Sequence, residues 1–238
     1  MMTSSRAIVF DLDDTLYPER EYAFSGFAAV AAAFEEVLGD PRASAAQMQK
    51  LFDTKHRPRV FNTILTQFGK PDDPHVVARM IDVYRNHAPS IHLYPDADGA
   101  LSHLCGRCKL GLITDGPPVS QWAKIDALHL RTRLDAIIVT GEWGPQFTKP
   151  HSSAFELVAE RLGADHHACA YIADNPAKDF LAPNALGWMT IHVRRPGGVY
   201  QHVVTPPGGR PDRIVDTLSA LRELFLGSAE SSVETQND

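Results

Sequence analysis

The sequence contains little cysteine, no long apolar run and no excess of basic residues. Three cysteines among 238 residues are too few for a disulfide framework and suit a reducing compartment. No stretch approaches the ~20 consecutive apolar residues that a membrane-spanning helix needs, and the apolar run near the N-terminus is too short for a signal peptide. The net charge of −6 argues against nucleic acid or an anionic membrane as the main partner. We therefore expect a cytoplasmic protein with neither partner, and the sequence leaves its oligomeric state open.

Two of the cysteines, Cys105 and Cys108, form a C-x-x-C pattern, which can indicate a zinc or redox site. A structural zinc site needs four ligands, yet Cys169 is the only other thiol in the sequence, and His103 is too close to Cys105 to complete such a site. The pattern lies where a predicted helix passes into a predicted strand. We therefore interpret the two cysteines as packing residues, with a metal or redox role as the alternative.

The aspartates that follow the first apolar run are the most informative residues present. Residues 8–10 read as a buried strand, and Asp11, Asp13 and Asp14 come directly after it. Side chains alternate along an extended backbone, so Asp11 and Asp13 point the same way. Two such carboxylates repel each other unless a cation lies between them or one is protonated. The pattern fits a hard divalent cation such as Mg²⁺, or a nucleophile beside a proton donor, and the structural alternative is a charged turn.

Three further polar clusters lie farther along the chain, next to predicted strands or helices. They are Thr114-Asp115-Gly116 after the run 109–113, Lys149 before a helical pattern, and Asp174 with Asp179 after the run 169–173. Short apolar runs separated by helical stretches predict repeated strand–helix units and a parallel sheet. Ligands of such sheets bind beyond the carboxyl ends of the strands, so we expect all four clusters to meet in one crevice.

The alternation of strands and helices predicts an α/β fold whose sheet is mainly parallel, with helices on both faces. We expect strands at 6–10, 108–113, 136–140, 169–173 and 189–193. Helices are expected at 21–38, 44–54, 57–68 and 74–87, then from 97 and from 117, and at 151–162, 176–186 and 215–225. The first four of these helices form an insertion without strand-like alternation.

The four clusters together resemble the motifs of the haloacid dehalogenase superfamily of phosphohydrolases. The family's first motif, D-x-D-x-T, is matched by residues 11–15, and its second by Thr114 at the end of an apolar strand. Its third motif is matched by Lys149, and its fourth by Asp174 and Asp179. The motifs occur in the family's order, so we identify the chain as a member from its sequence.

The resemblance also implies a division into domains. A Rossmann-like catalytic core is expected from residues 1–16 and 90–226. Residues 17–89 would form a helical cap of the family's first cap class, which lies over the crevice and opens to admit substrate. Such a lid excludes water from phosphoryl chemistry. Residues 227–238 are expected to be a disordered tail.

The resemblance assigns a role to each motif residue. Asp11 would be the nucleophile that forms an aspartyl-phosphate, and Asp13 would move protons to the leaving oxygen and from the attacking water. Mg²⁺ would be bound by Asp11, Asp174 and the main-chain carbonyl of Asp13, with Asp179 in support, either through water or paired with Lys149. The phosphate oxygens would be bound by the Thr114 hydroxyl, the N–H groups of Asp115 and Gly116, and Lys149.

The expected activity is that of a Mg²⁺-dependent phosphomonoesterase acting on a small phosphorylated metabolite, either a sugar phosphate or a nucleoside monophosphate. A phosphomutase would carry the same motifs, and a non-catalytic regulatory or binding module would keep the fold. A dehalogenase is disfavoured because the resemblance implies that dehalogenases lack the second carboxylate, here Asp13. In the predicted cap, the basic cluster of residues 55–59 would either bind a second anionic group or form a solvated face.

Overall fold

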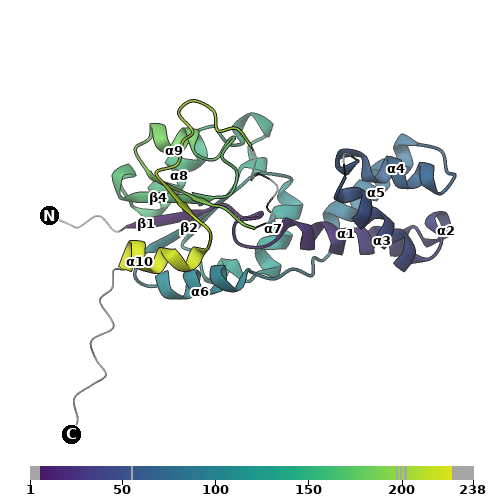
Figure 1. Ribbon diagram of the computed structural model, residues 1–238, viewed down its shortest axis with the longest axis horizontal. Helices are drawn as coiled ribbons and strands as arrows, with labels where there is room; N and C mark the ends of the chain where they lie inside the picture. Colours follow the sequence, from purple (N-terminus) through teal and green to yellow (C-terminus); the bar gives the residue numbers. More distant parts are fainter. Residues whose placement is uncertain (1–5, 55, 197, 199, 201–202, 227–238) are drawn as a thin grey trace, which may run out of the picture. The chain divides into compact units, whose positions relative to one another are not determined.

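The computed structural model describes residues 6–54, 56–196, 198, 200 and 203–226. Contacts divide the chain into two compact units (Figure 1). The core unit comprises Met1–Tyr17, Leu93–Gly116 and His129–Asp238, and the helical unit comprises Pro18–His92 and Pro117–Leu128. The predicted tail at 227–238 lies outside the described residues. Among the described residues, no helix has the length and apolar character needed to cross a membrane.

A six-stranded parallel sheet forms the centre of the core unit. Its strands are β1 (Ala7–Phe10), β2 (Lys109–Thr114), β3 (Ala136–Val139), β4 (Cys169–Ala173), β5 (Met189–Val193) and β6 (Arg213–Val215). They run in the order β3-β2-β1-β4-β5-β6, and every neighbouring pair is parallel. The predicted α/β fold with a mainly parallel sheet is therefore confirmed.

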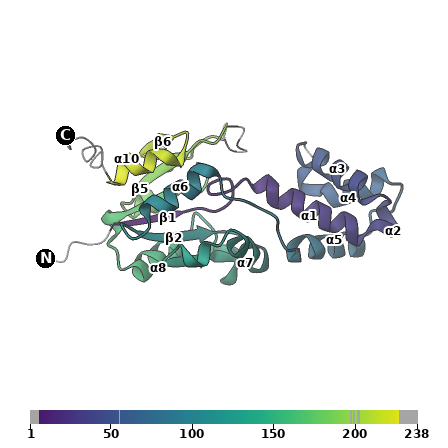
Figure 2. The ribbon, with the colours of Figure 1, turned by 90° about the horizontal axis from the view of Figure 1, so that it is seen from below.

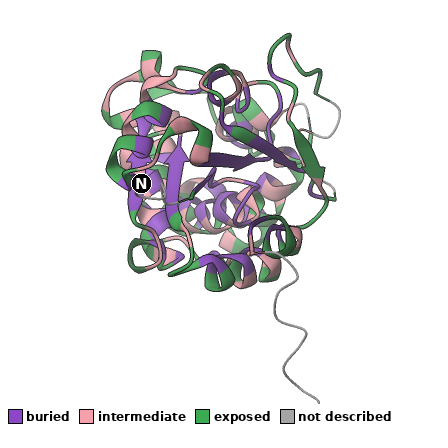
Figure 3. Ribbon diagram, turned by 90° about the vertical axis from the view of Figure 1, so that its left-hand side faces the viewer, coloured by how far each residue is buried: buried purple, intermediate pink, exposed green. Residues whose placement is uncertain are grey.

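Helices cover both faces of this sheet. They are α6 (Pro95–Leu104), α8 (Ser153–Leu162), α9 (Leu181–Ala185) and α10 (Leu221–Leu226). Figure 2 shows α6 and α10 along one side of the sheet and α8 along the opposite side. A Cβ at Gly111 would lie 3.0 Å from Val158 and 3.1 Å from Leu162, so the missing side chain lets α8 approach β2. Figure 3 shows the resulting interior, in which most strand residues are buried.

Short 3₁₀ turns occur in both units. They span Arg57–Arg59, Leu130–Thr132, Thr140–Glu142, Pro145–Phe147, His166–Ala168 and Leu218–Ala220. Two predicted helices are shorter than expected. The helix predicted at 176–186 begins at Leu181, because the preceding residues form a turn in which the Asn175 N–H donates to Asp179. The helix predicted at 215–225 is delayed because residues 213–215 pair with β5 as strand β6, which the sequence analysis missed.

The helical unit contains six α-helices among its described residues. They are α1 (Glu19–Ala33), α2 (Glu35–Leu38), α3 (Pro41–Phe52), α4 (Val60–Gln67), α5 (Pro74–Asn86) and α7 (Pro118–Ala127). Asp40 and Asp73 cap α3 and α5, and each is followed by proline at the first helical position, which is the expected start signal. The helix predicted at 21–38 is interrupted at Phe34. Nothing in the sequence indicated that α7 would group with these helices.

Candidate active site

The carboxyl ends of three neighbouring strands bring the predicted motifs to one edge of the sheet. Strand β1 lies between β2 and β4, and the Asp11 N–H extends the ladder by donating to the Ile172 carbonyl at 2.9 Å. Thr114 ends β2, and Asp174 directly follows β4. After β1 the chain forms β2 and β3 on one side of β1, and it then crosses over to form β4 on the other side. Parallel sheets bind ligands where the strand order reverses in this way.

Lys149 is the centre of the buried charge cluster. Its ammonium donates to Asp11 Oδ1 at 2.6 Å and to the Tyr171 hydroxyl at 2.9 Å. It also lies 2.9 Å from Asp179 Oδ1 as an ion pair. The Lys149 side chain is fully buried, as is that of Asp179, and the Asp11 side chain is 10% exposed. The structure thus joins three predicted residues and adds Tyr171.

Burial and neighbouring charge set the protonation of these groups. Burial raises the pKa of Asp11 to about 7, although Lys149 opposes the shift. Burial also raises the pKa of Asp174 well above its usual value, and repulsion from Asp11 and Asp179 adds to this effect. Burial disfavours the Lys149 ammonium, but the carboxylates of Asp11 and Asp179 outweigh it and hold the Lys149 pKa well above its usual value.

Three buried carboxylates form an acidic triad that fits a metal ion. One oxygen each from Asp11, Asp174 and Asp179 lies within 4.8 Å of the others, and this is the one such group of potential ligands among the described residues. Lys149 supplies one compensating charge, so the triad would carry an excess of negative charge if all three carboxyl groups were ionised. Hard divalent cations prefer carboxylate oxygens, and a cation here would relieve the repulsion that raises the pKa of Asp174.

Groups on β5 and in the β1 loop support Asp174. His192 Nε2 lies 3.0 Å from the Asp174 carbonyl oxygen, and the Thr15 hydroxyl donates to Asp174 Oδ1 at 3.4 Å. Asp13 lies in a separate environment. It is half-buried and accepts a hydrogen bond from the Tyr17 hydroxyl, and it is not part of the acidic triad. The two carboxylates of the D-x-D motif therefore have different partners.

Asp115 connects three motifs through its side chain. One carboxylate oxygen accepts from the Thr140 hydroxyl at 2.8 Å and from the Lys149 N–H at 3.2 Å. The other oxygen accepts from Lys178 Nζ at 2.7 Å. Burial alone would raise the Asp115 pKa, but Lys149 and Lys178 hold it below its usual value. Asp115 does not cap α7, whose capping position is Pro117.

Sequence reasoning missed Lys178, Thr140 and Tyr171. Lys178 could have been noticed because it lies between Asp174 and Asp179 in the fourth motif. Tyr171 occupies an apolar strand pattern that looks like ordinary core, and Thr140 carries no motif signal. The predicted phosphate contacts of Thr114 and Gly116 stay predictions.

The basic cluster of the helical unit has acidic partners. Arg57 pairs with Glu19, and Arg59 pairs with Asp72 at 3.1 Å. Lys55 lies outside the described residues. These ion pairs favour the solvated-face interpretation over an anion-binding one.

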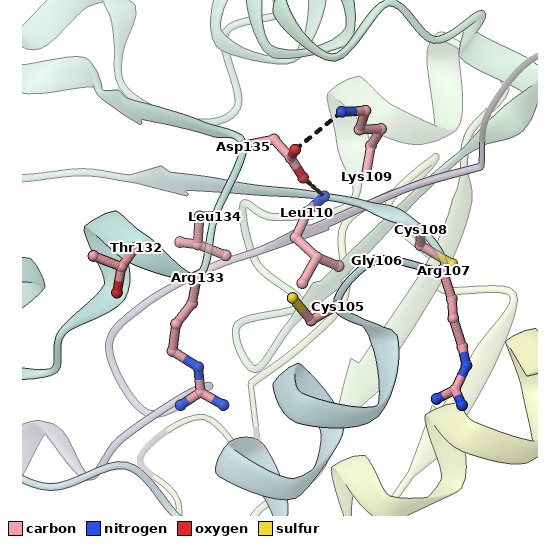
Figure 4. A pocket seen from close by; sticks show the side chains of 10 residues that line it. All are labelled: Cys105, Gly106, Arg107, Cys108, Lys109, Leu110, Thr132, Arg133, Leu134 and Asp135. Carbon is pink, nitrogen blue, oxygen red and sulfur yellow. Dashed lines mark hydrogen bonds and ion pairs between the residues drawn. The ribbon is translucent and has the colours of Figure 1, made fainter.

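A separate cavity of about 280 Å³ lies at the amino end of β2 and is lined by Cys105 and Cys108 (Figure 4). The two sulfur atoms point to different sides in this view. Lys109 crosses the rim to pair with Asp135 at 3.0 Å. Among the described residues, this region contains no group of three metal-ligating side chains.

Comparisons with known proteins agree with the fold and the motifs. A family model of haloacid dehalogenase-like hydrolases matches residues 5–187. Glyceraldehyde 3-phosphate phosphatase from Methanopyrus kandleri is 29% identical over 92% of this chain and 98% of its own length. Phosphoserine phosphatase from Thermus thermophilus is 30% identical over 73% of this chain and 65% of its own length. The solved HAD-hydrolase YfnB from Bacillus subtilis has a TM-score of 0.64 at 18% identity, covering 94% of this chain and 99% of that chain.

The family model covers most of the chain, and its range includes all four motif clusters. The chain belongs to the haloacid dehalogenase-like hydrolases. The membership predicted from the four motifs is confirmed, and so is the prediction that the protein is an enzyme of the hydrolase class.

Proposed function

We propose that the protein is a Mg²⁺-dependent phosphomonoesterase that hydrolyses a small phosphorylated metabolite through an aspartyl-phosphate. The observation that carries this proposal is the contact of the Lys149 ammonium with Asp11 beside a buried acidic triad. The names of the relatives support the substrate class, since they are phosphatases of glyceraldehyde 3-phosphate and of phosphoserine. A cytoplasmic location is part of the proposal, and the low cysteine content supports it.

In the first step, a carboxylate oxygen of Asp11 attacks phosphorus, and the bond between phosphorus and the ester oxygen breaks. Asp13, in its protonated form, transfers its proton to the departing oxygen, which leaves as an alcohol. The Tyr17 hydroxyl donates a hydrogen bond to one carboxylate oxygen of Asp13 and so helps to hold this side chain in place. Asp13 is then a carboxylate, ready to act as a base.

In the second step, Asp13 takes a proton from a water molecule that attacks the aspartyl-phosphate. Inorganic phosphate leaves, and the Asp11 carboxylate and the protonated Asp13 are restored. Lys149 holds Asp11 in one orientation and offsets its charge, so that an anionic phosphate can approach. A Mg²⁺ ion held by Asp11 and Asp174, with Asp179 in support, would supply further positive charge to the phosphoryl group.

The test is a panel of phosphorylated metabolites assayed for released inorganic phosphate with Mg²⁺. It should include triose and pentose phosphates, phosphoserine and nucleoside monophosphates, with Asp11→Asn as the inactive control. We expect phosphate release from at least one ester by the wild type and none by Asp11→Asn. A rate that depends on a bisphosphate primer would indicate a phosphomutase instead. Binding of esters without release of phosphate in any condition would indicate a non-catalytic module.

The helical segment at 17–89 is proposed to act as a cap that selects the substrate. Support comes from the separation of chemistry between the units, since every motif side chain described above belongs to the core unit. A change within the helical segment should therefore alter the preference among esters more than it alters the rate with a small generic ester.

A further inference from the structure

The phosphate of a substrate needs hydrogen-bond donors, and Lys149 has few to give. Its ammonium carries three hydrogens, and three protein oxygens surround it, from Asp11, Tyr171 and Asp179. All three distances lie between 2.6 and 2.9 Å, and the side chain is fully buried. Lys149 therefore orients the nucleophile in this structure, since it donates two of its three hydrogens to Asp11 and Tyr171 and lies beside Asp179 as an ion pair.

A second ammonium at the same edge of the sheet is placed differently. Lys178 lies in the turn between Asp174 and Asp179, and its side chain is 35% exposed. Asp115 Oδ2, at 2.7 Å, is its one side-chain partner among the described residues. An ammonium with a single carboxylate partner keeps two N–H groups for other acceptors.

Asp115 fixes where this ammonium lies. Its other oxygen accepts the main-chain N–H of Lys149 and the Thr140 hydroxyl, so the carboxylate cannot rotate away without breaking both bonds. Lys178 is also close enough to lower the pKa of Asp11, against the larger effect of burial. The Lys178 charge is therefore held near the nucleophile and remains accessible.

We propose that Lys178 binds the phosphoryl group of the substrate, donating hydrogen bonds to its non-bridging oxygens while Asp115 holds the ammonium in place. This inference rests on the proposed phosphatase function. It divides the work between two lysines, because Lys149 orients Asp11 and Lys178 contacts the substrate.

The experiment compares Lys178→Gln and Lys178→Arg with the wild type in Mg²⁺. The readouts are kcat and KM for p-nitrophenyl phosphate and for the preferred metabolite, and the affinity for inorganic phosphate measured from its effect on thermal unfolding. Lys178→Gln should weaken phosphate binding and lower kcat/KM about ten- to a hundred-fold, since charge-assisted hydrogen bonds are lost. The loss should be similar for every ester, and Lys178→Arg should recover part of it.

A matched control is available at the opposite end of the same sheet. Lys109 is 48% exposed and pairs with Asp135 at 3.0 Å, which closely parallels the pair of Lys178 with Asp115. Lys109→Gln should leave kcat/KM and phosphate affinity at the wild-type level. A similar loss in both variants would mean that any removed lysine charge has this effect, and would refute the proposal.

Other outcomes are equally decisive. If Lys178→Gln keeps the phosphate affinity and the kcat/KM of the wild type, the proposed contact of Lys178 with phosphate is refuted. A loss confined to esters that carry a second anionic group would show that Lys178 binds that group instead. If Lys178→Gln does not fold, Lys178→Met keeps the apolar stem and serves the same comparison. If the wild-type protein binds phosphate but releases none from any ester, the proposed function is wrong. The phosphate affinities of the wild type and Lys178→Gln would still test the contact of Lys178 with phosphate.

Discussion

Replacing Lys149 by methionine should destabilise the protein far more than a typical lysine substitution does. The change removes the ammonium and keeps an apolar stem of similar length. It leaves the carboxylates of Asp11 and Asp179 without their positive partner, and the Asp179 side chain is fully buried. An unpaired buried charge is costly because neither water nor a counter-charge stabilises it.

Breaking a buried ion pair from one side typically costs about 3–5 kcal/mol. For a chain of this length, each kcal/mol lowers the melting temperature by about 2–4 °C, so we expect a fall of about 10 °C. The control is Lys109→Met, because its pair with Asp135 has side chains 48% and 39% exposed. Exposed pairs contribute at most about 1 kcal/mol, so its melting temperature should fall by no more than ~4 °C.

Thermal unfolding is measured in chelator and then in excess Mg²⁺. The loss in Lys149→Met should be smaller with Mg²⁺, because a cation at the acidic triad replaces part of the missing charge. Adding Asp179→Asn to Lys149→Met should recover part of the stability in chelator, since it removes a carboxylate that lost its partner. Equal losses in Lys149→Met and Lys109→Met would refute the view that Lys149 neutralises a buried cluster.

Four further outcomes follow from the same site. Asp11→Asn should abolish phosphate release, and near wild-type turnover in this variant would rule out Asp11 as the nucleophile. Asp13→Asn should slow phosphate release about 10²–10⁴-fold but should still bind Mg²⁺ and phosphate. Chelator should remove activity, Mg²⁺ should restore it and Ca²⁺ should do so poorly. Burial raises the Asp11 pKa from 3.8 to about 7, so the folded protein without metal keeps this proton at pH values at which the unfolded chain has released it. The free energy of unfolding should therefore fall by up to about 4 kcal/mol between pH 4 and 7, which is measured as a falling melting temperature. Tyr171→Phe should lower kcat about ten-fold through a less ordered Lys149 ammonium, and an unchanged kcat would contradict this.

The sequence was most informative where chemistry follows the end of a strand. Asp11, Thr114 and Asp174 each come directly at or after an apolar run, and the parallel sheet brings those ends together for a geometric reason. Lys149 was predicted through the family resemblance, since a lysine before a helix carries no signal of its own. Its contact with Asp11 depends on a loop that returns to the edge of the sheet.

Other features depend on contacts that no local pattern records. Tyr171 lies in an apolar run, and only the fold brings its hydroxyl to Lys149. Asp115 was expected to bind phosphate through its main-chain N–H, and only the fold shows that its side chain bonds Lys178, which is 63 positions away. Strand β6 has three residues with mixed exposure, too few for a period of two to emerge. The grouping of α7 with the helical unit is likewise a matter of tertiary packing.

The charges of the site differ in burial, which explains why the site would use two kinds of cation. One is the Lys149 ammonium, which the fold holds in place, and the other is a divalent metal ion, which can exchange with solvent. Lys149 is permanently buried and compensates one carboxylate of the acidic triad. The raised pKa values of Asp11 and Asp174 mean that, without a metal, the remaining charge is reduced by protonation. A protonated Asp11 cannot attack phosphorus, because its oxygen lone pairs are far less nucleophilic than those of the carboxylate. A divalent cation that displaces this proton would therefore bind more tightly as the pH rises, and the same event would convert Asp11 into its reactive form.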